Sequence, residues 1–390
     1  MKIAMLGQKG IPAMYGGVER HVHDLSLHLA EMGHAVTVYS RRWYAKQANT
    51  NISGVRVQFV PSIHTKHLDT ITHVLLGTVH ALFQEYDVLH YHGVGPALLS
   101  WIPKIFAPKT KVVTTFHSID RYHQKWGTIA RWFLRMGEWC ACAFADETIT
   151  VSKSLEQYCL NEFYKETTYI PNGTDNVPKA EGKQTIAKFG LEKNKYLVMV
   201  SRLIPHKGAH ILIEAFKRLK MEHPDNARVR ELKLAIVGDS VHTDTYVALL
   251  KKQSERCADI VFTGFQSDEA LTELYQHALS LIHPSFNEGL PLTVLQAMSL
   301  GKPALLSAIP EHLELVRDAR VLFKENNVKS LTDTLESFLN MDVETHETIG
   351  THNKQVIEKN YRWDVIVPQI VTVYQKEKIK EKVRLRHKLA

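Results

Sequence analysis

The chain begins with an apolar strand, a glycine-containing loop, a helix and a second apolar strand, in the sequence KIAMLGQKGIPAMYGGVERHVHDLSLHLAEMGHAVTVY (residues 2–39). The two strand-length apolar runs are Lys2 to Leu6 and Ala35 to Tyr39. Between them, apolar residues recur at helical spacing from Val18 to Met32, and Gly33 then ends the helix. This order of elements is typical of a β-α-β unit in a parallel sheet.

The same alternation continues along the chain. Further apolar runs lie at 55–60, 87–91, 111–116, 147–151 and 168–170, and later at 196–200, 234–237, 260–262, 279–283 and 303–307. Helical stretches separate most of these runs. Because strands this apolar are buried on both faces, the pattern predicts parallel sheets covered by helices on both sides.

A polar segment that follows Pro171-Asn172-Gly173 divides the pattern into two halves. We therefore expect an α/β protein with two Rossmann-like, doubly wound domains that face each other across a cleft, which is the expected ligand site. The expected boundaries are an N-terminal domain at 1–173, a linker at 174–190 and a C-terminal domain at 191–360. A final helix at about 361–390 is expected to pack back on the first domain.

Length and composition place further limits on the protein. With 390 residues and 44% hydrophobic content, the chain is long enough for two cores. No stretch has the roughly twenty apolar residues of a spanning helix, and the first residues predict a strand and not a signal peptide, so we expect a cytoplasmic protein. The four cysteines form no C-x-x-C pair, which argues against a zinc site or a disulfide framework.

Basic residues are concentrated at the end of the chain. The formal net charge is +7, and the segment from Lys376 to Ala390 holds seven Lys or Arg against two Glu. The stretch Lys376 to Lys388 predicts either a weak contact with an anionic membrane surface, at the inner face of the membrane, or a solvated helix end. Since most of the excess charge lies in this tail, we expect no nucleic-acid partner.

Two loops are suited to bind an anion. Gly16 and Gly17 precede the first helix, where glycine lets backbone N–H groups and the positive helix end approach a phosphate closely. In the second half, Arg202 and Lys207 follow an apolar strand, and their side chains can converge on phosphate oxygens. The first loop lacks the dinucleotide fingerprint G-x-G-x-x-G, which disfavours a dehydrogenase.

The most informative segment is SFNEGLPLTVLQAM (residues 285–298). Pro291 is expected in the first turn of a helix, with Glu288 and Gly289 in the loop before it. The amino end of this helix would point its free N–H groups into the cleft.

Together these motifs resemble retaining glycosyltransferase family 4, a group 1 family with two Rossmann-like domains in the GT-B arrangement. The resemblance covers almost the whole chain, with its motifs in the expected order. It rests on Gly16-Gly17, His117 in TTFHS (114–118), VSKS (151–154), IPNG (170–173), Arg202 with Lys207, and Glu288 to Met298. Each motif is weak alone, and together they are specific.

The resemblance implies a role for each matched residue. Residues that match Arg202 and Lys207 bind the donor diphosphate. The match to Glu288 holds a hydroxyl of the donor sugar, and the match to His117 lies beside that sugar, although a packing role is the alternative for this histidine. These four are the expected catalytic residues. The expected donor-binding residues are Gly16, Gly17, Gly289, Leu290, Pro291, Leu292, Thr293 and Gln296.

One position departs from the family pattern. Members commonly have a second glutamate eight residues after the first, and it grips the nucleotide ribose, whereas this chain has Gln296. Glutamine still forms hydrogen bonds with hydroxyl groups, but it lacks the charge-assisted bonds that are about twice as strong as neutral ones. We expect an altered nucleotide affinity, which does not by itself require a loss of activity.

A departing nucleotide diphosphate gathers negative charge, which a catalyst must offset with cations or oriented N–H donors. The sequence has no D-x-D motif for a metal. Arg202, Lys207 and the helix beginning at Pro291 supply positive potential instead, so we expect neither a metal nor another cofactor. Close histidine pairs such as His90 and His92 arise by chance in a chain with 22 histidines, and they predict no metal site.

The resemblance further implies front-face retention, in which the leaving phosphate accepts the proton of the acceptor. Double displacement at Glu288 would require a second carboxyl group about 5 Å away, and the sequence offers no obvious partner. The predicted function is transfer of a hexose or deoxyhexose from a UDP- or GDP-sugar to a lipid-linked oligosaccharide or polysaccharide intermediate. The alternatives are a nucleotide-sugar epimerase of the same fold and a non-catalytic member that binds nucleotide sugar.

Overall fold

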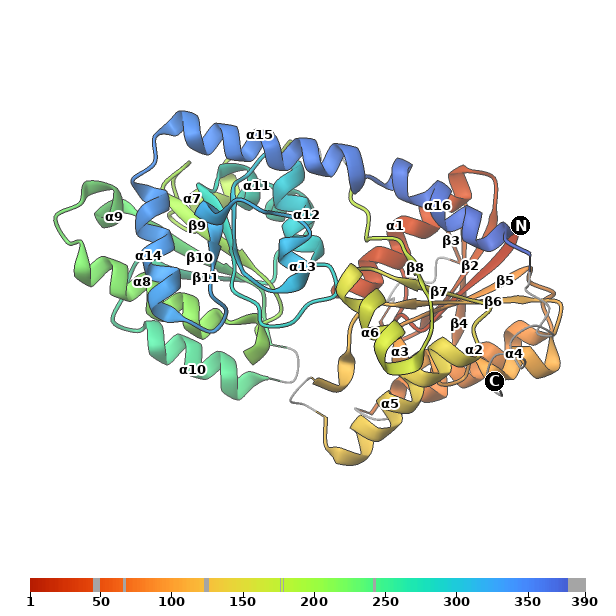
Figure 1. Ribbon diagram of the computed structural model, residues 1–390. Coiled ribbons are helices and arrows are strands. Elements are labelled where there is room, and N and C mark those ends of the chain that lie inside the picture. The colour runs from red at the N-terminus through yellow and green to blue at the C-terminus, as the bar shows by residue number, and fades with distance from the viewer. Residues whose placement is uncertain are drawn as a thin grey trace. The chain divides into compact units, whose positions relative to one another are not determined.

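The computed structural model describes residues 1–44, 50–65, 68–122, 126–175, 177, 179–240 and 243–377. The chain forms two compact units (Figure 1): unit 1 comprises Met1–Asn172 and the chain from Trp363 onward, and unit 2 comprises Gly173–Arg362. Among the described residues, no helix combines the length and the apolar character needed to cross a membrane.

Unit 1 is built on an eight-stranded sheet with the order β3-β4-β2-β1-β5-β6-β7-β8. Its strands are β1 (Lys2–Leu6), β2 (Ala35–Arg41), β3 (Asn51–Ile52), β4 (Val55–Val60), β5 (Val88–His92), β6 (Lys111–Phe116), β7 (Glu147–Thr150) and β8 (Thr168–Tyr169). All neighbours pair in parallel except β3 and β4. The strand order reverses between β1 and β5, which is the position where doubly wound sheets bind ligands.

Helices cover both faces of this sheet (Figure 1). They are α1 (Gly17–Glu31), α2 (Asp69–Leu82), α3 (Val94–Ala97), α4 (Trp101–Phe106), α5 (Thr128–Ala143), α6 (Lys153–Phe163) and α16 (Trp363–Gln375), with the short 3-10 turn η1 (Asp120–Tyr122). One apolar core joins α1 and α16 to the sheet, and a second core joins α2 to the other face. The burial of both faces explains why the strands are almost continuously apolar.

The helix α16 is fixed to unit 1 by apolar and polar contacts. Trp363 is 1% exposed and belongs to the first core. The buried ammonium group of Lys111 donates hydrogen bonds to the carbonyls of Val373 and Lys376, both at 2.6 Å. The hydroxyl of Tyr374 lies 2.7 Å from Nδ1 of His90.

The basic segment predicted to touch a membrane, Lys376 to Lys388, lies outside the described residues from position 378 onward. Of its basic side chains, Lys376 is described, and its ammonium group is 3.4 Å from the Glu147 carboxylate.

Unit 2 contains a six-stranded, fully parallel sheet with the order β11-β10-β9-β12-β13-β14. Its strands are β9 (Tyr196–Val200), β10 (Lys233–Val237), β11 (Ile260–Gly264), β12 (Ser280–His283), β13 (Ala304–Ser307) and β14 (Leu322–Phe323). Numbered along the chain, these strands have the order 3-2-1-4-5-6 of nucleotide-binding doubly wound folds. The order reverses between β9 and β12.

The helices of unit 2 are α7 (Gln184–Lys188), α8 (Ala209–Glu222), α9 (Ala227–Glu231), α10 (Asp244–Ser254), α11 (Asp268–His277), α12 (Leu292–Ser299), α13 (Pro310–Leu313), α14 (Val328–Leu339) and α15 (Val343–Asn360), with 3-10 turns η2 (Pro205–Lys207) and η3 (Ala319–Val321). Part of the segment expected as a linker, 174–190, is packed on α11. The backbone N–H of Ile186 donates to Glu273 at 2.8 Å, and that of Ala180 donates to Gln276 at 2.9 Å.

Candidate functional site

The strand order of unit 2 brings together the loops that follow β9 and β12. Gly208 connects η2 to α8 with φ of 73°, and a Cβ atom at this position would lie 2.1 Å from the carbonyl oxygen of Pro284. The backbone N–H of Phe286 also donates to the His206 carbonyl at 2.8 Å. Glycine is therefore required at 208, because it allows the two loops to touch through their backbones.

Three ionisable side chains meet where these loops touch. The ammonium group of Lys207 contacts Oε1 of Glu288 in a buried ion pair. The same oxygen lies 2.8 Å from Nε2 of His283, the last residue of β12. No described residue donates a hydrogen bond to the other carboxylate oxygen, Oε2, so it keeps its capacity to accept one.

Burial and charge set the protonation states of this group. Burial alone would raise the pKa of Glu288, but Lys207 and His283 hold it well below its ordinary value. Burial lowers the pKa of Lys207, against the opposing effect of Glu288. It also lowers the pKa of His283, so that imidazole is neutral near pH 7. The result is a buried carboxylate paired with one ammonium group and one neutral hydrogen-bond donor.

Arg202 adds an exposed positive charge beside this buried group. It lies close enough to Lys207 to contribute to the lowering of that lysine's pKa. In the part of the chain that the structure describes, no carboxylate forms an ion pair with its guanidinium group. A guanidinium group without a carboxylate partner can donate hydrogen bonds to phosphate oxygens from its planar set of N–H groups.

The segment 288–296 lies directly after this group. Gly289, Leu290 and Pro291 are buried, while Leu292, Thr293 and Gln296 are half-buried. The helix α12 begins at Leu292 and not at Pro291, because Pro291 has an extended ψ of 111° and forms the N-cap. The first N–H groups of a helix have no partner within it, so those of Leu292 and Thr293 are oriented as anion donors. No described residue hydrogen-bonds the side chain of Gln296.

The corresponding position in unit 1 is the loop after β1. Gly16 is the N-cap of α1 with φ of 105°, and a Cβ atom there would lie 1.9 Å from the Glu19 carboxylate. The hydroxyl of Tyr44 organises the loop: it accepts from the N–H groups of Met14 and Tyr15, at 2.8 and 3.0 Å, and donates to the Tyr15 carbonyl at 2.9 Å. Gly17 is the first residue of α1. Gly16 and Gly17 thus place no side chain of their own at the helix amino end, where the Glu19 carboxylate lies and accepts a hydrogen bond from the N–H of Lys9 at 3.2 Å.

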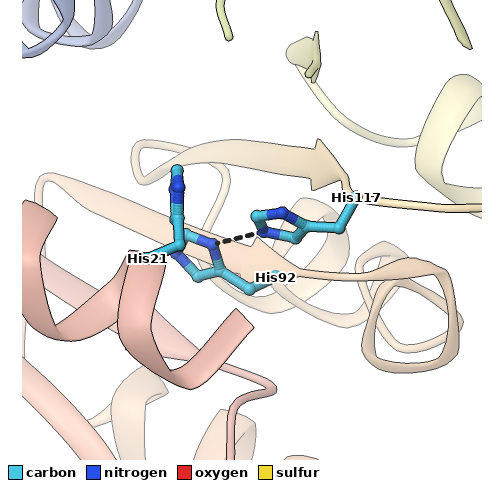
Figure 2. Close-up of side chains that lie close together, drawn as sticks. All are labelled: His21, His92 and His117. Atoms are coloured by element: carbon cyan, nitrogen blue, oxygen red, sulfur yellow. Dashed lines mark hydrogen bonds between the residues drawn. The ribbon is translucent and has the colours of Figure 1, made fainter. Parts of the chain in front are cut away.

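Three buried histidines lie near this loop at the strand ends (Figure 2). His21 belongs to the second turn of α1, His92 ends β5, and His117 follows β6. Nδ1 of His92 and Nε2 of His117 are 3.3 Å apart. The ring centres of His21 and His117 are 4.8 Å apart.

The structure brings several predicted residues together and adds others. Lys207 and Glu288 are in direct contact, with Arg202 close by, whereas Gln296 forms no hydrogen bond with them. Sequence reasoning missed His283 and His21. A signal existed for both: His283 ends an apolar strand run, and His21 lies one turn into the helix after Gly16-Gly17.

Two protein-family profiles match the chain, one for each unit. The profile described as glycosyltransferase family 4 matches residues 15–176, and the profile described as glycosyl transferases group 1 matches residues 183–361. With two parallel-sheet units, these matches define a glycosyltransferase of the GT-B fold, built from two Rossmann-like domains. The chain belongs to the group 1 glycosyltransferases.

Similar proteins match over nearly their full lengths. An uncharacterized glycosyltransferase of Methanocaldococcus jannaschii is 26% identical, with 96% of this chain and 98% of the relative covered. The O-antigen chain mannosyltransferase C of Escherichia coli is 21% identical, with the same coverage of 96% and 98%. The crystal structure of Anabaena HepE in complex with UDP and glucose matches with a TM-score of 0.77 and 21% identity, over 96% of this chain and 99% of that one.

Proposed function

We propose that this glycosyltransferase moves a hexose or deoxyhexose, with retention and without a metal, from a nucleotide diphosphate sugar to a lipid-linked oligosaccharide or polysaccharide intermediate. UDP or GDP is the proposed nucleotide. The glycan acceptor is supported by the E. coli relative, which is an O-antigen chain mannosyltransferase. The nucleotide donor is supported by HepE, whose structure holds UDP and glucose.

The observation that carries the proposal is the group of Arg202, Lys207 and Glu288 in unit 2. Arg202 has no carboxylate partner among the described residues, so its charge is available for a diphosphate. The proposed leaving diphosphate gathers charge, and Arg202, Lys207 and the amino end of α12 would stabilise it. Oε2 of Glu288, which receives no hydrogen bond from the described chain, would accept one from a hydroxyl of the donor sugar.

The surroundings of Glu288 favour this positioning role over nucleophilic attack. Its side-chain partners among the described residues are Lys207 and His283, and neither is a carboxyl group. A retaining double displacement would require a second carboxyl group about 5–5.5 Å away as acid and base. Front-face departure, in which the leaving phosphate accepts the acceptor's proton, requires no such partner. His117 is proposed to contact the donor sugar.

A donor panel tests the proposal. UDP-, GDP-, dTDP- and ADP-sugars are incubated with EDTA and lipid-linked acceptors, and nucleotide release is measured together with the anomeric configuration of the product. We expect release with one donor, only when acceptor is present, and a product that retains the donor's configuration. Arg202→Ala should weaken donor binding about 10- to 100-fold, since a hydrogen bond to a charged group contributes about 1.5–3 kcal/mol.

The matched control for this substitution is Arg218→Ala, which removes an exposed arginine of the same unit that pairs with Glu222 on the surface. It should leave donor binding unchanged. Conversion of the donor without acceptor would instead indicate an epimerase. Donor binding without any turnover would indicate a non-catalytic member, and no binding would overturn the proposal.

We also propose a cytoplasmic protein whose basic tail contacts anionic lipid weakly. Co-sedimentation with anionic and neutral vesicles tests this, with a variant that ends at Glu377 as the control. The tail contact is rejected if both proteins bind anionic vesicles equally.

A further inference from the structure

The imidazole rings of three histidines lie close together in unit 1. His21, His92 and His117 come from three different elements, and one ring nitrogen of each lies within 4.8 Å of the others (Figure 2). Their exposed fractions are 2%, 2% and 7%. Three histidines from a helix and two strand ends are therefore enclosed together, with His117 the most accessible to solvent.

The spacing fits a tetrahedral metal ion. Zinc binds histidine nitrogen at about 2.0–2.1 Å, which places two ligands of a tetrahedron roughly 3.3 Å apart. Nδ1 of His92 and Nε2 of His117 already have this separation, 3.3 Å. The ring nitrogen of His21 lies within 4.8 Å of the other two, so it has to move by up to about 1.5 Å to complete three ligands of such a tetrahedron.

Nδ1 of His92 and Nε2 of His117 share a hydrogen bond, which a bound metal ion would replace. Neither ring nitrogen of His21 has a partner of standard geometry, although the Asn172 side chain is close enough to raise its pKa somewhat against the larger effect of burial. Nε2 of His92 lies 3.4 Å from the weak acceptor Sδ of Met5, which favours a proton on Nε2 and a lone pair on Nδ1.

Protonation does not oppose binding of a cation. Burial is the first cause that lowers the pKa of each ring, to about 3 for His21 and well below the ordinary value for His92 and His117. All three are neutral near pH 7, and neutral imidazole is the form that binds a metal. Three histidines with one open position are an established coordination set for zinc.

We propose that His21, His92 and His117 form a binding site for a divalent transition-metal ion, for which Zn²⁺ is the probe. The ion takes no part in the proposed transfer reaction, but its site includes His117, which is proposed to contact the donor sugar. Because the ion would hold the ring of His117, Zn²⁺ should inhibit transfer and EDTA should restore it. The proposal concerns binding and is measured without donor or acceptor, so it can fail while the proposed function stands.

The test is metal binding by the full-length chain. The protein is first stripped with EDTA and then titrated with Zn²⁺ by calorimetry and with Co²⁺ by visible absorption. We expect one tight equivalent, an intense spectrum of four-coordinate Co²⁺ that Zn²⁺ abolishes, and a rise in Tm with Zn²⁺. His21→Asn should weaken binding at least about 100-fold, since loss of even an outer-shell partner costs 10- to 100-fold.

The matched control is His73→Asn. His73 is also fully buried in unit 1, and its ring nitrogens likewise have no partner of standard geometry, but it does not belong to the cluster. The variant His73→Asn should bind Zn²⁺ with the same affinity as the parent chain. Equal binding by His21→Asn and the parent chain would overturn the proposal. If His21→Asn does not fold, anomalous diffraction at the zinc edge from crystals of the parent chain locates the bound ion. A zinc ion found anywhere other than between these three rings would reject the proposed site.

Discussion

Lys207 and Glu288 each place a charge inside unit 2, and neither charge can be removed without affecting the other. Lys207→Met should lower the free energy of unfolding by about 3–5 kcal/mol, because it leaves a buried carboxylate without its cation. The double variant Lys207→Met/Glu288→Gln removes both charges and should recover part of this loss. Urea unfolding of the three proteins measures the effect, and a double variant less stable than Lys207→Met would contradict it.

The pH dependence of stability gives a second test of the same pair. In the parent chain, Lys207 and His283 hold the pKa of Glu288 well below its ordinary value against burial, so ionised Glu288 stabilises the fold above that ordinary value. This contribution is lost as the pH falls through the depressed pKa. In Lys207→Met, burial should raise the pKa of Glu288, and stability should then increase as the pH falls. In urea titrations, Lys207→Met should gain stability relative to the parent chain as the pH falls from 8 to 4, and parallel pH profiles would exclude this coupling.

His117 should act as a neutral ring. Burial, together with the nearby His21, keeps its pKa well below the ordinary histidine value, so it carries no proton charge between pH 6 and 8. We expect no ionisation of His117 in the pH profile of kcat/KM over this range. His117→Ala should lower kcat/KM about tenfold, the effect of one neutral hydrogen bond, and His117→Asn should lower it less. If the pH profile of kcat/KM of the parent chain shows an ionisation that is missing in His117→Ala, this expectation is contradicted.

Single residues of the candidate site were predictable where a motif fixes them. Arg202, Lys207 and Glu288 were found because each follows an apolar strand run in a recognisable pattern. Their contacts were not predictable, since Lys207 and Glu288 are far apart in the sequence and meet only through the strand order. His92 illustrates the limit, because in the sequence it looked like a chance neighbour of His90, whereas the fold places it beside His21 and His117.

At the scale of elements, the close approach of two loops depends on Gly208. Gly208→Ala should cost more stability than Gly33→Ala. Both glycines have positive φ, 73° and 82°, so both substitutions introduce backbone strain of about 1–2 kcal/mol. A Cβ atom at Gly33 meets nothing within 4 Å, whereas one at Gly208 lies 2.1 Å from the Pro284 carbonyl oxygen.

The additional overlap at Gly208 should cost about 1–3 kcal/mol more than at Gly33. It should also weaken nucleotide binding, because the displaced loop carries Lys207, while Gly33→Ala should leave binding unchanged. Urea denaturation and calorimetric titration with UDP and GDP measure the two effects. Equal losses of stability would show that the loops separate without cost.

The sheets were more predictable than their edges. The apolar run at 196–200 coincides with β9, and that at 111–116 coincides with β6, because central strands buried on both faces need uninterrupted apolar residues. The two-residue edge strands β3 and β14 gave no such signal, although β8, an edge strand of the same length, lies within the run predicted at 168–170. The start of α12 was placed one residue early, because proline fits both the N-cap and the first turn.

At the scale of the whole molecule, the chain leaves unit 1 after Asn172 and returns to it at Trp363. Unit 1 is therefore completed by a helix that is nearly two hundred residues away in the sequence. The helix supplies seven buried side chains to the first core: Trp363, Ile366, Val367, Ile370, Val371, Val373 and Tyr374. A final helix at about 361–390 was expected, and the structure places α16 at Trp363–Gln375. Its buried partners, such as Lys111, could not be identified from the sequence, because nothing in the strand of Lys111 points to a helix so far along the chain.

Removal of this helix should unfold unit 1 selectively. A chain that ends at Arg362 loses the seven buried side chains of α16 and exposes the apolar face of the sheet beneath them. Loss of one large buried side chain already costs about 2–5 kcal/mol, which approaches the whole stability of a typical domain. Limited proteolysis followed by mass spectrometry should find cleavage throughout residues 1–172 and a protected fragment of unit 2. The control chain ends at Glu377, keeps α16 and should be cleaved no faster than the full-length protein. Protection of unit 1 in the chain that ends at Arg362 would show that its sheet and α1 form a stable core without the returning helix.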